Sequence, residues 1–180
     1  MTVTGLSVLT VAGCARPKSA PAPRAEAKTK AAHAGPTSAE GAAELQSVFS
    51  EANEYVLEGQ LKEAASVYER AIDSGPKSFK LHYNLGNVYM QRGSVDKAIT
   101  QYRKALAMNP EDADVCVNLG VAYFKEGRLE EAIDSYKRAL ALDKNDAVAH
   151  YNLGVAYEKA GRQSEADSEF TTYHQLKRNQ

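Results

Sequence analysis

A segment of 34 residues recurs four times in this chain and accounts for everything from Leu45 to Gln180. The copies stay in register without gaps: each has Tyr at its eleventh position, Gly at its fifteenth, Ala at its twentieth and an aromatic residue at its twenty-fourth. Such a period is typical of chains in which each unit folds as one supersecondary element and buries its apolar face against its neighbours. The repeats are residues 45–78, 79–112, 113–146 and 147–180.

Each repeat contains two helix-length segments around a glycine, as residues 79–91 and 96–108 do around Gly93. Glycine adopts the positive φ that ends a helix at little steric cost. Small residues at the eighth position let the paired helices approach closely, with Tyr at position eleven filling the remaining space. Polar residues before the first helices can cap free N–H groups. These expected caps are Ser78, Asp112 and Asp146.

The second helix of the last repeat, expected over residues 164–176, is unusually polar. Asp167 and His174 stand where earlier repeats have Ile or Leu. A stacked solenoid needs a polar outer face on its terminal unit. We therefore expect this helix to cap the stack with both side chains in water. Without a separate capping helix, an end-to-end homodimer can form.

The repeated pattern of Asn-Leu-Gly, Tyr, Gly, Ala, aromatic and Pro resembles the tetratricopeptide repeat family. The resemblance covers about three-quarters of the chain. It implies an all-α, right-handed superhelical solenoid of four helix-turn-helix repeats. It also implies a non-enzymatic scaffold that binds a protein or peptide partner.

In that family the first helices line a concave groove, and the resemblance implies the same groove here. Positions five, nine and twelve would make it apolar and aromatic with interspersed amides, which suits a peptide with apolar anchors. We expect about half of these side chains to be purely structural. The implied groove residues are Phe49, Asn53, Tyr83, Asn84, Asn87, Asn118, Phe124, Tyr151 and Asn152.

Three of these residues, Asn84, Asn118 and Asn152, share the sixth position of successive repeats. An amide both donates and accepts, so it can bond a peptide backbone whatever the peptide's side chains are. The row resembles the asparagine ladder of tetratricopeptide scaffolds that bind extended peptides. The alternative is that Asn is common at this position and is only solvated. The family's carboxylate clamp is absent, because Phe49 and Asp114 replace basic residues that it needs.

The segment before the repeats has the features of a processed and tethered N-terminus. Residues 1–13 are apolar or small and uncharged, as in a secretory signal peptide. Val11-Ala12-Gly13-Cys14 resembles the lipobox of bacterial lipoproteins, which implies cleavage before Cys14, acylation of its side chain and a membrane anchor. No Lys or Arg occurs in residues 1–5, so either the true start lies upstream or the segment is not a signal.

Residues 14–44 are expected to form the acylated cysteine and a disordered linker. From Ala15 to Glu44 the chain has no Leu, Ile, Val, Phe, Tyr or Met, so it has nothing to bury that would offset the entropy of ordering. Ala15 follows the cysteine, and the sorting rule of enteric-type lipoproteins then implies the outer membrane, facing the periplasm.

Composition excludes several other classes. With 22 basic and 23 acidic residues the net charge is −1, which lacks the surplus that a nucleic-acid binder uses. No phosphate loop, CxxC or HExxH motif occurs, so we expect no catalytic residue and no cofactor. His82, Cys116 and His150 share position four, but packed helices lie about 8–10 Å apart, too far for shared zinc ligation, so we expect no metal site.

The sequence thus predicts an envelope lipoprotein that presents a helical scaffold on a flexible spacer and recruits a protein partner. The alternative is a soluble cytoplasmic adaptor, or a regulatory repeat region, without a lipid anchor.

Overall fold

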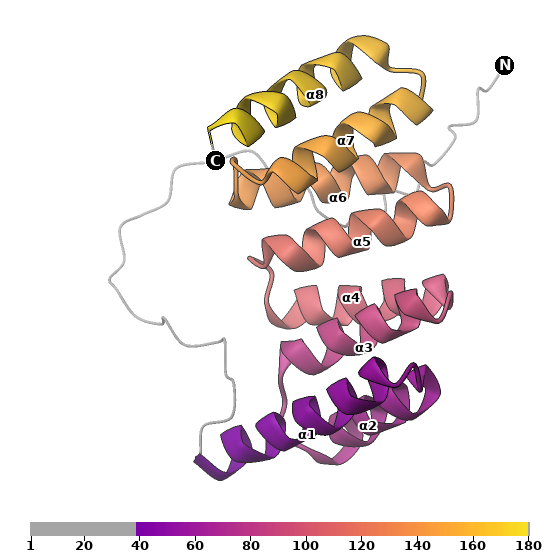
Figure 1. The fold of residues 1–180 in the computed structure, drawn as a ribbon, viewed down its shortest axis with the longest axis vertical. Helices are drawn as coiled ribbons and strands as arrows, with labels where there is room; N and C mark the ends of the chain where they lie inside the picture. Colours follow the sequence, from indigo (N-terminus) through magenta and orange to yellow (C-terminus); the bar gives the residue numbers. More distant parts are fainter. Residues whose placement is uncertain (1–38, 180) are drawn as a thin grey trace, which may run out of the picture.

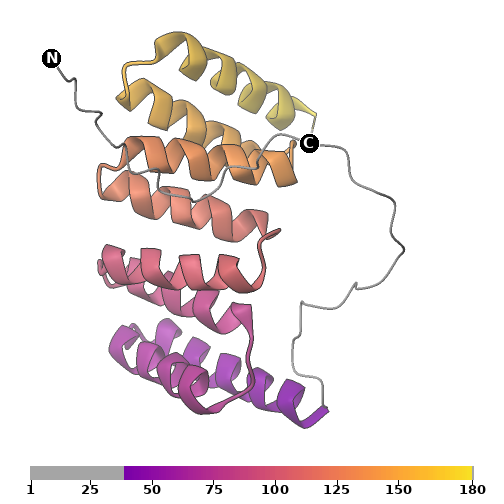
Figure 2. The same cartoon turned by 180° about the vertical axis from the view of Figure 1, so that it is seen from behind.

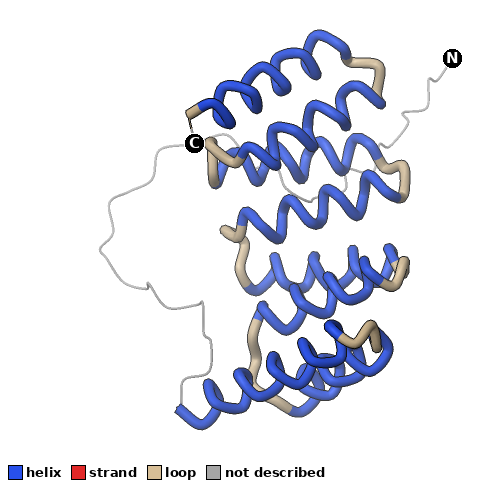
Figure 3. The backbone as a smooth tube through the Cα atoms, viewed as in Figure 1, coloured by secondary structure: helices blue, strands red, loops and turns tan. Residues whose placement is uncertain are grey.

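The computed structural model describes residues 39–179, and over that range it consists of helices joined by short turns (Figure 3). The helices pair into hairpins that stack along the long axis of the molecule (Figures 1 and 2). This confirms the all-α solenoid expected from the repeats. The helices are α1 (Ala39–Leu57), α2 (Leu61–Ser74), α3 (Phe79–Gln91), α4 (Val95–Met108), α5 (Ala113–Lys125), α6 (Leu129–Leu142), α7 (Ala147–Lys159) and α8 (Gln163–Arg178).

The turn inside each hairpin depends on a glycine in the left-handed region. Gly93 has φ +75° and Gly127 has φ +73°. A Cβ on either glycine would meet no atom within 4 Å, so backbone conformation rather than space requires glycine here. The turn also satisfies the last helical carbonyls, since Ser94 N–H donates to Tyr89 O at 2.9 Å. Gly59 and Gly161 adopt the same conformation.

Two of the three expected N-caps form. Asp112 accepts from Val115 N–H at 3.0 Å, and Asp146 accepts from the first-turn N–H groups of α7. The prediction for Ser78 is wrong: its side chain makes no capping bond. Ser78 is buried, and its backbone carbonyl accepts from Leu81 N–H at 3.2 Å instead, which satisfies that donor without the hydroxyl.

Close packing inside the hairpins depends on the glycine at position eight. A Cβ on Gly86 would lie 2.6 Å from Cε1 of Tyr102, and one on Gly120 would lie 2.5 Å from Cε1 of Tyr136. The ring at position twenty-four therefore rests directly on the opposite helix. The sequence predicts that the tyrosine at position eleven fills this space, but the ring that meets the glycine is the one at position twenty-four.

The hairpins join through apolar faces of the first helices. Leu81 and Leu85 of α3 are each 1% exposed, and Val115 of α5 is fully buried. Each first helix packs on the second helix of the preceding hairpin, and α5 also contacts both α3 and α7. The first helices therefore run side by side along one face of the stack.

Helix α1 begins earlier than expected. Sequence analysis extended the disordered linker to residue 44, but residues 39–44 are helical. The reason is local: Ala39, Ala42 and Ala43 have high helix propensity, and Glu40 in the first turn complements the helix dipole. The expected signal segment 1–13, Cys14 and linker residues 15–38 lie outside the described residues.

Helix α8 is the polar end of the stack, as expected. Asp167 and His174 are exposed, and Ala166 is the buried residue of this helix. Gln163 donates from Nε2 to Asp167 Oδ1 at 2.8 Å, which keeps both side chains on the outer surface. Within residues 39–179, no helix has the length and apolar character needed to cross a membrane.

Candidate functional site

The nine residues expected to line a groove all lie on first helices, so the structure brings them to one face of the stack. Asn53 and Tyr151 are exposed, and the others are half-buried. By helix they are Phe49 and Asn53 on α1; Tyr83, Asn84 and Asn87 on α3; Asn118 and Phe124 on α5; and Tyr151 and Asn152 on α7.

A hydrogen-bond network crosses the boundary between the second and third repeats. The side-chain amide of Asn118 donates to the hydroxyl of Tyr83 at 3.1 Å and to Oδ1 of Asn87 at 3.3 Å. Tyr102 donates from its hydroxyl to the same Oδ1 at 2.7 Å. Burial, reinforced by Tyr83, raises the pKa of Tyr102 well above its usual value, so this hydroxyl remains a donor.

The preceding repeat boundary uses the same kind of contact. Asn84 forms a side-chain hydrogen bond with the hydroxyl of Tyr68. Burial raises the pKa of Tyr68, and the bond from Asn84 offsets part of that rise. The asparagine at position six therefore joins neighbouring repeats, a role that neither sequence-based alternative for these residues had included.

The next boundary is different, because Val117 and Val121 replace the residues corresponding to Tyr83 and Asn87. Val117 is buried at 8% exposure and Val121 is half-buried. Close by, Lys159 Nζ lies 5.6 Å from the ring centroid of Phe124. The face thus changes from amide-rich on α3 to apolar on α5 and α7.

Two of the residues at position four, His82 and His150, each bond a side chain of the second helix of their own hairpin. His82 Nδ1 lies 2.8 Å from Gln101 Oε1, and His150 Nδ1 lies 2.6 Å from Glu169 Oε2. Cys116 is buried at 1% exposure. In residues 39–179, no three or more His, Cys, Asp or Glu side chains are grouped so that they could hold a metal ion.

Sequence analysis missed a set of contacts at the hairpin turns. Arg128 bonds Glu131 and lies 4.5 Å from the ring centroid of Tyr123. Arg162 repeats the arrangement with Glu165 and Tyr157 one unit later. The signal was present, because Arg at position sixteen and Glu at position nineteen recur in the last two copies.

A tyrosine on α3 makes a related contact with the preceding hairpin. The hydroxyl of Tyr89 donates to the carboxylate of Glu69 on α2. Burial and the neighbouring Glu69 charge raise the pKa of Tyr89 to about 12. The Tyr89 contact joins the first and second repeats away from the amide network, whereas the bonds from Arg128 to Glu131 and from Arg162 to Glu165 lie within single repeats.

Comparison with known proteins agrees with this geometry. The family model described as the cilia and flagella-associated protein 70 C-terminal domain, a tetratricopeptide-type domain, matches residues 10–177, and the chain belongs to this family. The fold is a tetratricopeptide-type solenoid, a class that generally serves as a scaffold for protein partners. No curated protein sequence matches the chain.

Solved structures of MamA are similar to this chain. MamA MSR-1 is 34% identical with a TM-score of 0.64, over 69% of this chain and 72% of that one. MamA AMB-1 is 32% identical with a TM-score of 0.65, over 72% of this chain and 70% of that one. MamA from Desulfovibrio magneticus RS-1 has a TM-score of 0.70 at 24% identity, over 74% of this chain and 75% of that one, and shows the fold alone.

Proposed function

We propose that this protein is a non-enzymatic scaffold that binds an extended peptide, or a peptide segment of a partner protein, along the face lined by α1, α3, α5 and α7. The observation that carries the proposal is incomplete burial of apolar side chains on successive first helices. Phe49, Tyr83 and Phe124 are half-buried. Contiguous apolar surface with a polar rim is typical of a protein-binding site.

The two halves of the face would contact different parts of a peptide. On α3 and α5, the donors of Asn118 already bond Tyr83 and Asn87, so its Oδ1 is the atom that can accept from a peptide N–H. On α5 and α7, Phe124, Val121 and their neighbours would take apolar side chains. Asn84 and Asn152 are the other members of the proposed row, and Asn53 lies on α1 at the position that Asn87 has on α3.

Selection of peptides from a phage-displayed library against the full chain tests this function. We expect the selected peptides to carry apolar anchors, because the α5 and α7 portion offers mainly apolar contacts. Phe124→Ala should weaken their binding about tenfold in fluorescence polarisation, which corresponds to about 1.4 kcal/mol. Lys104→Ala, on the exposed surface of α4, is the matched control. Equal binding by both variants would count against the groove.

We also propose that Cys14 is acylated and anchors the scaffold to the outer membrane, facing the periplasm. The support is the lipobox-like Val11-Ala12-Gly13-Cys14 and the apolar segment before it. The alternative of a soluble cytoplasmic adaptor makes the opposite prediction. Radiolabelled palmitate should enter the wild-type chain in the membrane fraction and be absent from Cys14→Ala. A soluble, unlabelled wild-type chain would support the adaptor.

A further inference from the structure

The last hairpin leaves open a surface that the earlier hairpins bury. Tyr151 of α7 is 47% exposed, whereas Val117 at the same position of the third repeat is 8% exposed. Phe170 of α8 is half-buried, whereas the tyrosines at its position in the earlier repeats are at most 2% exposed. In those repeats the next first helix supplies the cover. The earlier tyrosines are Tyr68, Tyr102 and Tyr136.

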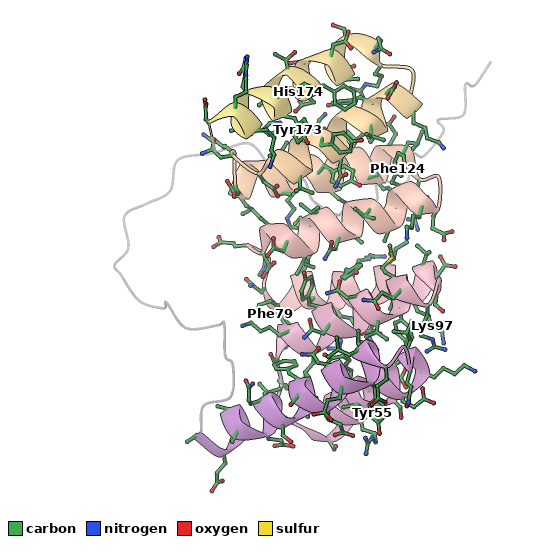
Figure 4. All side chains as sticks on the ribbon, in the orientation of Figure 1. Tyr55, Phe79, Lys97, Phe124, Tyr173 and His174 are labelled. Carbon is green, nitrogen blue, oxygen red and sulfur yellow. The ribbon has the colours of Figure 1, made fainter. Side chains whose placement is uncertain are left out.

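The open surface is aromatic and aliphatic. The ring centroid of Tyr151 lies 5.9 Å from that of Phe170 and 5.2 Å from that of Tyr173. Val148, one turn before Tyr151, is 60% exposed. Tyr173 lies on α8 at the top of the stack, beside His174 (Figure 4). We call Val148, Tyr151, Phe170 and Tyr173 the terminal surface.

Earlier repeats show what an equivalent surface receives. The same ring pair recurs as Phe49 with Tyr68 and as Tyr83 with Tyr102, each at 6.3 Å between centroids. A helix covers each pair, and its position-six asparagine bonds a tyrosine of the pair, as Asn118 bonds Tyr83. The terminal surface is therefore built on the plan of a surface that binds a helix.

The terminal surface has lost most of the polar groups of the earlier ones. Phe170 replaces the buried tyrosine, and Val155 replaces the residue corresponding to Asn87. The second repeat supplies three groups to its network with Asn118, namely Tyr83, Asn87 and Tyr102, and only the hydroxyl of Tyr83 has an equivalent here, in Tyr151. An amide buried on this surface would keep only the Tyr151 hydroxyl as a partner. Its remaining polar capacity would be unpaired, which is costly, so an aliphatic side chain fits better at that point.

A second copy of this chain does not fit the terminal surface. Where later first helices carry buried Leu, Val or Ala, α1 carries exposed Ser47, Glu51 and Glu54. Placing two carboxylates against aromatic rings would require costly desolvation.

We propose that the terminal surface binds an amphipathic helix of a partner protein. That helix carries aliphatic side chains at i, i+4 and i+7, the spacing of Val115, Leu119 and Ala122 in α5. It carries acidic residues in its first turn, because the last turn of α8 is basic at Lys177 and Arg178. This surface lies at the end of the stack and adds a second docking position to the proposed groove.

A synthetic peptide of residues 111–125 provides the probe, since α5 covers the equivalent surface of the second hairpin. It carries Cys116→Ala, Asn118→Leu and a fluorescent label. A staple between residues 121 and 125 holds it helical, because a free peptide of this length is barely helical. The matched peptide retains Asn118. We expect the Asn118→Leu peptide to bind the full chain at least about tenfold more tightly. In the Phe170→Tyr variant the two peptides should differ less in affinity, because the tyrosine restores the hydroxyl that earlier repeats have at this position.

Surface variants separate this site from the groove. Val148→Lys and Tyr173→Lys should each weaken the Asn118→Leu peptide more than about tenfold, whereas Phe124→Ala should leave it unchanged. Circular dichroism checks that each variant is folded. Three results would overturn the proposal: no binding at 1 mM peptide, loss of binding in Phe124→Ala instead, or a dimer in sedimentation velocity that Val148→Lys dissociates. None of these results would count against the proposed groove, which the library peptides test separately.

Discussion

At the scale of single residues, the asparagine at position six shows how one side chain can join two repeats. Asn118 belongs to α5, and the two residues to which its amide donates, Tyr83 and Asn87, belong to α3. In this half-buried network, two amides and two hydroxyls form hydrogen bonds with one another instead of with water. Such a network stabilises the boundary only while each donor has its acceptor.

Asn118→Ala should therefore lower the free energy of unfolding. The variant leaves Asn87 and Tyr83 without the amide donor in a half-buried position, and we expect a loss of about 1–2 kcal/mol. Urea unfolding followed by circular dichroism measures it. Asn53→Ala, at an exposed position of α1, is the control and should change stability by less than about 0.5 kcal/mol. Equal effects of the two variants would show that the network contributes nothing.

Two glycines should respond to alanine for different physical reasons. Gly120→Ala places a methyl group 2.5 Å from Cε1 of Tyr136, so the buried ring or the helix beneath it must shift, at a cost of about 1–3 kcal/mol. Gly127→Ala meets no atom but must adopt φ +73°, at a cost of about 1–2 kcal/mol. Tyr136→Leu should partly restore the melting temperature of Gly120→Ala, and it should not restore that of Gly127→Ala. Restoration of both variants would contradict this distinction.

At the scale of elements, the last two hairpin turns carry charged contacts. Arg128, the N-cap of α6, bonds Glu131 in the first turn of that helix, while its guanidinium lies over Tyr123 of α5. Arg162 does the same at the next turn and also lies 3.6 Å from Glu130 of α6, which links the third and fourth repeats. The contacts are exposed, so each contributes little by itself.

The pH dependence of stability should show the contribution of the ion pair between Arg128 and Glu131. The hydrogen bond from Arg128 lowers the pKa of Glu131 below its usual 4.5. The ion pair therefore stabilises the fold above that value, and the contribution is lost as the pH falls through the lowered pKa. Glu131→Gln should cost about 0.5 kcal/mol or less at pH 7 in urea unfolding. The difference from wild type should vanish in acid, and a difference that grows in acid would contradict the assignment.

At the scale of the whole molecule, the two ends of the stack differ. The outer face of α1 carries Ser47, Glu51 and Glu54 in place of the apolar residues of later first helices. The opposite end keeps Tyr151 and Val148 exposed beside the polar α8. In a stack of repeats, an inner hairpin is covered on two sides and an end hairpin on one.

The rates of amide hydrogen exchange should be lower in the inner hairpins than at the ends of the stack. Amides of α4 and α5 should exchange most slowly, because both neighbouring hairpins must separate before they open. Amides in residues 39–44 and in α8 should exchange at least about tenfold faster. Mass spectrometry of peptic fragments measures the rates. Uniform protection from α1 to α8 would show that the molecule opens as one unit.

Much of the fold was predictable because the period repeats the same local choices. The glycine at each turn and the bounds of α3 required no knowledge of distant contacts, and the expected helix over 79–91 is confirmed. The cap at Ser78 and the start of α1 were wrong. At Ser78 the backbone carbonyl, and not the hydroxyl, accepts from a first-turn N–H group, and at α1 a run of alanines extends the helix toward the N-terminus. Neither feature belongs to the repeated pattern.

The candidate site was less predictable, because a position within a repeat does not state what lies across the boundary. The sequence alone determined that this chain forms stacked helical hairpins, since helix periodicity and left-handed glycines are local properties. The tertiary structure decided that Asn84 and Asn118 join repeats, that Tyr136 rests on Gly120, and that Tyr151 stays exposed. Those outcomes depend on which side chains meet between helices, and packing against a neighbour is absent from a linear pattern.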